Sequence, residues 1–149
     1  MYPYILAIHN IVRWIALILG IIVVIQAGLG FFRHKEWKEP VRKLSLYYTI
    51  GLDIQILLGL LLYLFFSSIT RAAFQDLSSA MSNPGMRFFA LEHAFYMILA
   101  VVFGHLGSVL ARKSTDSQTK YRRTLIWVSL SVLMILLGMP WDRPFLPQF

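Results

Sequence analysis

Long apolar runs dominate the chain and predict its elements. Four stretches, at about 4–32, 46–66, 86–111 and 121–140, are mostly apolar and are separated by polar segments. A helix needs about 20 residues to cross a hydrocarbon core of about 30 Å. Unpaired backbone polar groups are not tolerated in lipid, so runs of this length favour helices over strands. The sequence predicts an all-α fold, a four-transmembrane-helix bundle that forms a single integral membrane domain over 1–149.

The positive charge is concentrated in two loops. One follows the first run and the other follows the third, with five basic residues each: Arg33, Lys35, Lys38, Arg42 and Lys43, then Arg112, Lys113, Lys120, Arg122 and Arg123. The positive-inside rule places these loops in the cytoplasm. We therefore expect up-down topology in a bacterial inner membrane, with both termini on the outer (periplasmic) side. Residues 72–81 are expected to form one short surface helix.

Composition narrows the class of protein further. Hydrophobic residues make up 58% of the chain and charged residues only 14%, whereas a soluble domain has about 25% charged residues. This excludes a water-soluble enzyme. The net charge of +7 lies in loops that flank the membrane, so it does not indicate a nucleic-acid partner. The chain has no cysteine, which excludes disulfides, thiolate metal sites and covalent c-type haem attachment.

Ionisable side chains inside the runs are the candidate functional residues, because they are costly in a membrane. His9 lies six residues after Pro3, and His93 lies six residues after Arg87. At 1.5 Å per residue, both histidines are expected about 9 Å below the outer ends of their helices. Two imidazoles at one depth are typical of the axial ligands of a membrane b-type haem. We therefore predict His9 and His93 as metal ligands of one haem b on the outer-leaflet side.

The neighbours of this pair fit a cofactor. Gly104 belongs to a row of small residues that follows His93 on one helix face, as expected for a flat macrocycle, although close helix packing uses the same residues. Haem propionates need cations, and arginine matches carboxylate geometry. The outer arginines are Arg13 and Arg87, with Arg71 and Arg143 also available.

Glu92 has two expected roles. It is predicted either to orient the imidazole of His93 or to pair with Arg13. The cofactor-free alternative is an Arg13–Glu92 ion pair that stabilises the bundle, with both histidines as hydrogen-bonded side chains.

A second polar group is expected nearer the basic end. Asp53 and His105 both lie about 10 Å from that end, and with Gln55 or Gln26 they form a possible quinone or proton site, since a quinone needs hydrogen-bond donors and proton exchange. The alternative is that Asp53 reaches the basic loop. A second haem would pair His105 with His34, but the spacing of these residues from His93 and His9 mismatches by nearly 20 Å, so one haem is predicted.

A family resemblance rests on the order of these motifs: His9 with Arg13-Trp14, Gln55 with Gly59 and Tyr63, Arg87 with Glu92-His93, and Pro140-Trp141 with Arg143-Pro144. Together they resemble small four-helix membrane proteins described as cytochrome b-like, which are common in Bacteroidota and their relatives. The resemblance implies haem b and electron transfer. The chain departs from dihaem cytochromes because it lacks an inner histidine pair.

The expected function is that of an electron-transfer subunit rather than a stand-alone enzyme. Such a subunit would sit in the lipid bilayer within a larger respiratory or photosynthetic membrane complex and exchange electrons with quinone or an outer redox partner. A chlorophyll-type pigment held by one histidine is a variant of this hypothesis. The main alternative is a cofactor-free accessory subunit that packs against a larger complex. A transporter is less favoured, because the sequence shows no repeated halves or broken helices.

Overall fold

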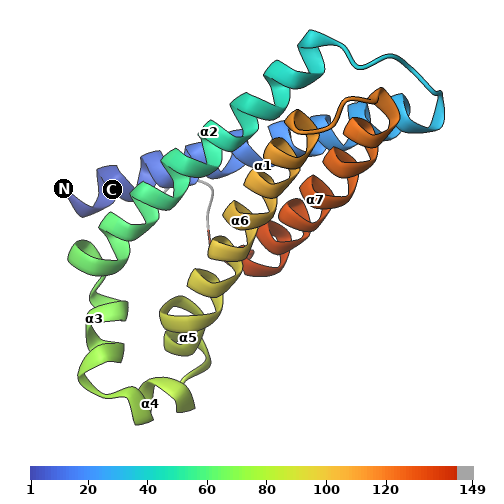
Figure 1. The fold of residues 1–149 in the computed structure, drawn as a ribbon. Coiled ribbons are helices and arrows are strands. Elements are labelled where there is room, and N and C mark those ends of the chain that lie inside the picture. Colours follow the sequence, from blue (N-terminus) through green and yellow to red (C-terminus); the bar gives the residue numbers. More distant parts are fainter. Residues whose placement is uncertain (144–149) are drawn as a thin grey trace.

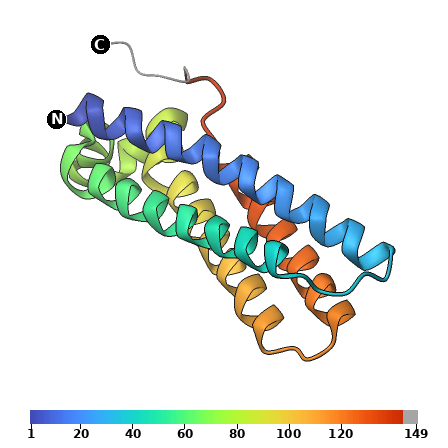
Figure 2. The same ribbon diagram turned by 90° about the horizontal axis from the view of Figure 1, so that it is seen from above.

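Four long helical spans make up most of the chain. The computed structural model describes residues 1–143, and the described residues contain helices and no strand. The helices long and apolar enough to cross a membrane are Tyr2–Phe32, Glu39–Phe66, Pro84–Arg112 and Ser117–Gly138. Consecutive spans run in opposite directions along the bundle (Figures 1 and 2). The predicted all-helical fold is confirmed, with four helical spans in the described residues that are long and apolar enough to cross a membrane.

Two of the spans change helix type along their length. The first span is a single helix, α1 (Tyr2–Phe32), and the fourth is α7 (Ser117–Gly138). The second and third spans each contain a π-helical turn, and two short helices connect them. In chain order these elements are α2 (Glu39–Leu61), η1 (Leu62–Phe66), α3 (Ser68–Gln75), α4 (Leu77–Ser82), α5 (Pro84–Arg87), η2 (Phe88–Glu92) and α6 (His93–Arg112).

The second and fourth spans begin before their apolar runs, because the residues there favour a helix N-terminus. The second span begins at Glu39 rather than at residue 46; Pro40 suits a first helical turn, and the acidic Glu39 is favourable at a helix N-terminus. The fourth begins at Ser117 rather than at residue 121, because the Asp116 carboxylate accepts hydrogen bonds from the backbone N–H groups of Gln118 and Thr119. The hydrogen bond from the Thr119 side chain, together with these two backbone hydrogen bonds, lowers the pKa of the Asp116 carboxyl below its usual value.

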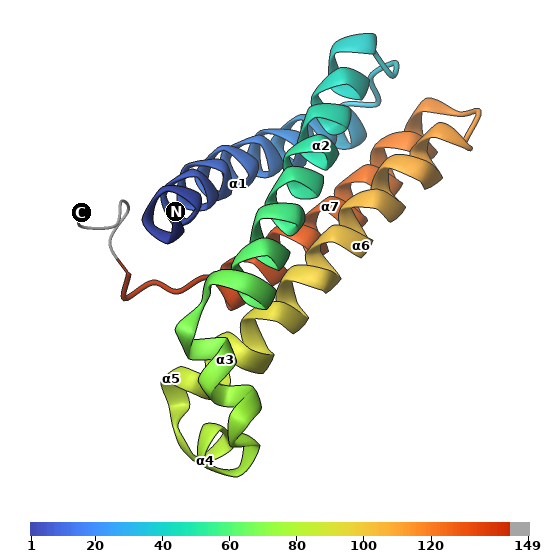
Figure 3. The same ribbon diagram turned by 90° about the vertical axis from the view of Figure 1, so that its left-hand side faces the viewer.

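The prediction of one surface helix at 72–81 is wrong. This segment contains the end of α3 and most of α4, which lie beyond the end of α2 (Figure 3). Asp76 separates the two helices, and its carboxylate accepts a hydrogen bond from the backbone N–H of Ser79 at 3.0 Å. A strong N-cap residue inside the stretch therefore ends one helix and starts the next.

The middle of the bundle is held by packing around Tyr48, which is fully buried. Its hydroxyl lies 2.6 Å from Ser131 Oγ, and Ser131 Oγ in turn donates to the Ala100 carbonyl at 2.5 Å. Tyr48 is therefore the donor to Ser131, and the chain of hydrogen bonds joins α2, α7 and α6. Gly20 of α1 makes room for the ring, because a Cβ there would lie 2.8 Å from Tyr48 Cε2. In lipid, such close packing and interhelical hydrogen bonds hold helices together.

We expect Gly30→Ala to destabilise the bundle and Gly28→Ala to leave it unchanged. A Cβ on Gly30 would overlap the ring of Tyr121, whereas a Cβ on Gly28 would meet only Leu125 Cδ1 at 3.8 Å. Tyr121 cannot turn aside freely, because its ring contacts Trp37 and its hydroxyl donates to the Glu36 carbonyl. Overpacking costs about 1–3 kcal/mol, or roughly 3–10 °C in the thermal unfolding midpoint. Thermal unfolding of both variants in detergent tests this, and equal midpoints would contradict it.

Candidate functional site

A cavity of about 540 Å³ opens at the end of the bundle where α1 begins. Its wall is formed by the first half of α1, the second half of α2 with η1, the start of α3, η2 with the start of α6, and the end of α7 with the residues that follow it. Most lining side chains are apolar. The polar side chains of the lining include His9, Asn10, Arg13, Gln55 and His93. An apolar cavity with a few converging polar groups is the usual form of a small-molecule or cofactor site.

The structure brings His9 and His93 together, although they lie on different helices. Their ring centres are 6.4 Å apart, and the ring planes are inclined by 64°. Arg13 follows His9 at the i+4 spacing that places two side chains on one helix face, and both residues line the cavity. The equal depths estimated for the two histidines therefore correspond to proximity in the structure.

His93 is oriented by the end of α7. Its Nδ1 lies 2.7 Å from the carbonyl oxygen of Gly138, the last residue of that helix. A carbonyl at a helix C-terminus has no partner within its own helix, so it accepts the Nδ1–H and leaves Nε2 with its lone pair. Histidines that bind metals usually donate their second nitrogen to a carbonyl or carboxylate in this way. Sequence reasoning missed this orienting group and considered Glu92 for the role, with a pair to Arg13 as the alternative.

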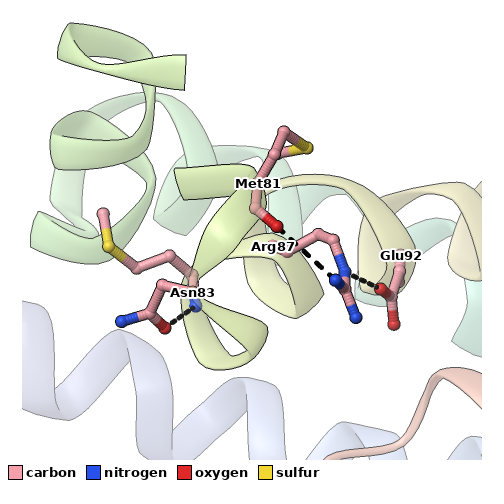
Figure 4. A network of polar contacts seen from close by, with 5 residues as sticks. Met81, Asn83, Arg87 and Glu92 are labelled. Atoms are coloured by element: carbon pink, nitrogen blue, oxygen red, sulfur yellow. Dashed lines mark hydrogen bonds and ion pairs between the residues drawn. The ribbon is translucent and has the colours of Figure 1, made fainter. Parts of the chain in front are cut away.

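Glu92 pairs with Arg87 instead of His93 or Arg13. Arg87 Nε lies 2.7 Å from the Glu92 carboxylate (Figure 4). The two residues are five apart, and the π-helical turn η2 lies between them, so the five-residue repeat of a π-helix explains their contact. Neither residue lines the cavity. Neither predicted contact of Glu92 is present, and Arg87 does not reach the space where a macrocycle was expected.

His9 is held by α2. Its Nε2 lies 3.1 Å from the Gln55 side-chain nitrogen, so the amide donates to the imidazole. Gly59, one turn further along α2, leaves space beside the ring, because a Cβ there would lie 3.4 Å from His9 Cε1. Gln55 therefore belongs to the His9 site and not to the inner group with Asp53 and His105, where the sequence had placed it.

Three buried polar atoms around the cavity make no hydrogen bond with any described residue: His9 Nδ1, Arg13 Nε and Gln55 Oε1. The ion pairs among residues 1–143 are Arg42–Glu39, Arg87–Glu92 and His105–Asp53, so Arg13 has no carboxylate partner in this part of the chain. A buried polar group without a partner is unfavourable by about 1–3 kcal/mol. Three such atoms around one cavity indicate that it is built for a polar or charged occupant.

A second arginine stands at the cavity mouth. Arg143 lines the cavity, and its guanidinium carbon lies 5.1 Å from the ring centre of Phe89, in the geometry of a cation–π contact. Of the four outer arginines considered from the sequence, Arg13 and Arg143 line the cavity, and Arg71 and Arg87 do not. Pro144, which completes the last motif of the resemblance, lies outside the described residues.

The inner group contains Asp53 and His105 in direct contact. His105 Nε2 lies 3.3 Å from Asp53 Oδ1, and the two side chains are 43% and 52% exposed. His105 Nδ1 lies 3.1 Å from the Val101 carbonyl and donates to it. The contact is an ion pair when the imidazole of His105 carries a proton on both nitrogens. The predicted neighbourhood of these two residues is present, on a surface that faces outward from the bundle.

Two other sequence candidates lie away from the cavity. A Cβ on Gly104 would lie 2.5 Å from Leu52 Cδ1 and 3.4 Å from Tyr48 Cε1, so this glycine serves close packing of α6 on α2. His34 lies in the turn after α1, is exposed, and adopts a φ of 49°. It has no contact that would pair it with His105.

Sequence reasoning missed the two π-helical turns that shape the cavity. η1 supplies Leu62 and Tyr63 to the lining, and η2 supplies Phe89 and ends directly before His93. The Tyr63 hydroxyl donates to the Ala90 carbonyl and so joins the two turns. Single π turns are frequent at functional sites, but no residue pattern in either segment distinguishes it from a regular α-helix.

The comparisons with known proteins add no identification. The resemblance to cytochrome b-like membrane proteins therefore stays a prediction from the motifs of the sequence. No family model matches the chain, and no curated protein and no solved structure has significant similarity to it.

Proposed function

We propose that the chain holds one b-type haem in the cavity, with His9 and His93 as its axial ligands. The observation that carries the proposal is the pair of imidazoles, from α1 and α6, with ring centres 6.4 Å apart beside a cavity of about 540 Å³. A bond from a metal to an imidazole nitrogen is about 2 Å long, and each ring centre lies roughly 1 Å behind its nitrogen. Two such bonds to one metal require ring centres roughly 6 Å apart, which agrees with the structure.

The chain contributes orientation and charge to this site. The Gly138 carbonyl fixes the tautomer of His93, so that Nε2 is the nitrogen available to a metal. On binding, the metal would replace the Gln55 amide as the partner of His9 Nε2, and the amide would remain beside the ring. Arg13 and Arg143 would pair with the propionate carboxylates. When bound, haem supplies one-electron redox chemistry, whose potential depends on the axial ligands and on local charge.

The wider role we propose is electron transfer within a larger respiratory or photosynthetic complex of a bacterial inner membrane. The basic loops would face the cytoplasm and the cavity would face the outer side. The described chain consists almost entirely of membrane helices and their short connections, which suits a subunit that exchanges electrons with protein partners or with quinone. The cofactor-free accessory subunit remains the alternative that the experiment below separates.

Spectroscopy on the purified chain tests this proposal. After expression in haem-sufficient cells, we expect about one haem per chain by pyridine haemochrome, with a Soret band that shifts on reduction with dithionite. A colourless preparation would contradict the proposal and favour the accessory subunit. An extractable chlorophyll-type pigment without haem would assign the cavity to the pigment variant.

Asp53 and His105 are the proposed contact for a quinone headgroup. Their side chains are half exposed on the surface of two membrane spans, where a lipid-soluble molecule has access. Both side chains can exchange protons, and quinone chemistry couples electrons to protons. The exposed pair therefore supports a quinone site that is separate from the cavity.

We expect Asp53→Asn to slow quinol-dependent reduction of the haem without changing its spectrum. The asparagine keeps the size of the side chain but cannot exchange a proton with His105, and a lost acid–base group slows a reaction by about a hundredfold or more. Stopped-flow reduction by a soluble quinol measures the rate, with dithionite reduction as the internal reference. Glu36→Gln, an exposed carboxylate of the basic loop, is the matched control. An unchanged rate in Asp53→Asn would remove this residue from the quinone site.

A further inference from the structure

A second cavity, of about 330 Å³, lies at the opposite end of the bundle from the histidines. It is formed by the first turns of α2, the last turns of α6, the start of α7 and Trp37 from the preceding loop. Its location between membrane spans at the basic end places it where lipid headgroups meet a bundle of this kind. The inference drawn from it does not depend on the proposed haem.

The cavity carries an excess of positive charge. Arg42, Arg112 and Lys120 line it, together with one carboxylate, Glu39. Glu39 is already paired with Arg42, whose Nε lies 2.8 Å from the carboxylate. Arg112 and Lys120 take part in no ion pair with a described residue. Two cations are therefore left to face the cavity without a carboxylate partner in this part of the chain.

The cavity also has a buried donor with no partner. Ser45 lines it and is only 5% exposed, and its Oγ makes no hydrogen bond within residues 1–143. Serine in a helix commonly donates to the carbonyl one turn earlier, but Ser45 does not. A buried hydroxyl without an acceptor is unfavourable, so an anionic oxygen beside it would provide the missing acceptor.

We infer that this cavity binds the phosphate of an anionic phospholipid. Arg112 and Lys120 supply the charge, and Ser45 supplies a neutral hydrogen bond. The lipid form of phosphate is favoured over free phosphate because Leu46 and Ala111 add apolar surface to the lining. Exposed apolar side chains continue along α2 from Leu46 through Tyr47 to Ile50, where acyl chains can lie. Basic pockets between membrane helices are known to recognise anionic headgroups.

Native mass spectrometry of the detergent-purified full chain tests this inference. Phosphatidylglycerol and phosphatidylcholine are the probes, because they differ in headgroup charge and not in acyl chains. We expect one phosphatidylglycerol per chain, bound at least about tenfold more tightly than phosphatidylcholine. Arg112→Gln combined with Lys120→Gln should weaken its binding roughly thirtyfold, since each lost cation near the membrane surface contributes about a factor of five.

The matched control is Lys43→Gln combined with Arg122→Gln, which removes two cations from the same end without touching the cavity lining. Ser45→Ala keeps every charge and should weaken phosphatidylglycerol binding several-fold. Equal affinity for the two lipids would overturn the inference, as would equal losses in the cavity and control pairs. Full displacement of phosphatidylglycerol by millimolar inorganic phosphate would overturn the lipid source. Unchanged helicity and elution volume show that a variant is folded.

Discussion

Purified His93→Ala protein is expected to lack the haem spectrum of the parent chain. His93 is the better-oriented ligand of the two, because its Nδ1 is hydrogen-bonded to the Gly138 carbonyl and its Nε2 is available to a metal. Removing a residue that is hydrogen-bonded to a metal ligand lowers metal affinity by about 10–100-fold. Removing the ligand itself should therefore lower haem affinity by at least about 100-fold. The measurement is haem per chain by pyridine haemochrome after purification in detergent. His9→Ala should give the same result through loss of the opposite ligand.

His105→Ala is the matched control for these variants. It removes an imidazole from the same helix, α6, but from a position outside the cavity, so haem content should remain near that of the parent. If His9→Ala and His93→Ala both retained an unchanged haem spectrum, the ligand assignment would be wrong even with haem bound. If His93→Ala alone lost the spectrum, the metal would have a single histidine ligand.

The membrane spans follow from the sequence because length and hydropathy determine them almost alone. No other structure satisfies the backbone of a run such as 4–32 in lipid, and the helix Tyr2–Phe32 agrees closely with it. The depths of His9 and His93 were predictable for a related reason. The rise per residue is constant along a helix, so counting from each outer end placed both side chains at one level.

Side-chain partners were less predictable, because they depend on helix type and rotation. The regular α-helix assumed for the third span placed Glu92 near His93 or Arg13, but the π-helical turn before His93 brings Glu92 to Arg87. The rotation of α2 directs Gln55 toward His9 while Asp53, two residues earlier, faces His105 on the outside. Residues two apart on a helix lie on different faces, so the three-residue inner group expected from the sequence could not form.

The cofactor-free alternative expected from the sequence also changes in the structure. Its central element was an ion pair between Arg13 and Glu92, which would have neutralised the buried guanidinium. Glu92 is instead bound to Arg87, and the Arg13 guanidinium carbon lies 5.7 Å from the ring centre of Trp14. A buried cation in a membrane span without a carboxylate partner in residues 1–143 is costly. Replacing Arg13 therefore tests whether it serves haem binding or holds the bundle together. The two roles predict opposite changes in the stability of the haem-free protein.

Arg13→Met is expected to have opposite effects on the empty protein and on haem binding. In chain expressed without haem, methionine removes a buried charge that has no described carboxylate partner, which should raise stability by roughly 2–3 kcal/mol and the thermal midpoint by about 4–10 °C. With haem, the variant loses a cation proposed to pair with a propionate, so haem per chain should fall. Thermal unfolding of the haem-free protein and haemochrome assays of the loaded protein measure the two effects. Arg71→Met, at an exposed position of α3 that does not line the cavity, should change neither by much. A structural role for Arg13 predicts the reverse sign in the haem-free protein, because a residue that holds the bundle together lowers its stability when it is replaced.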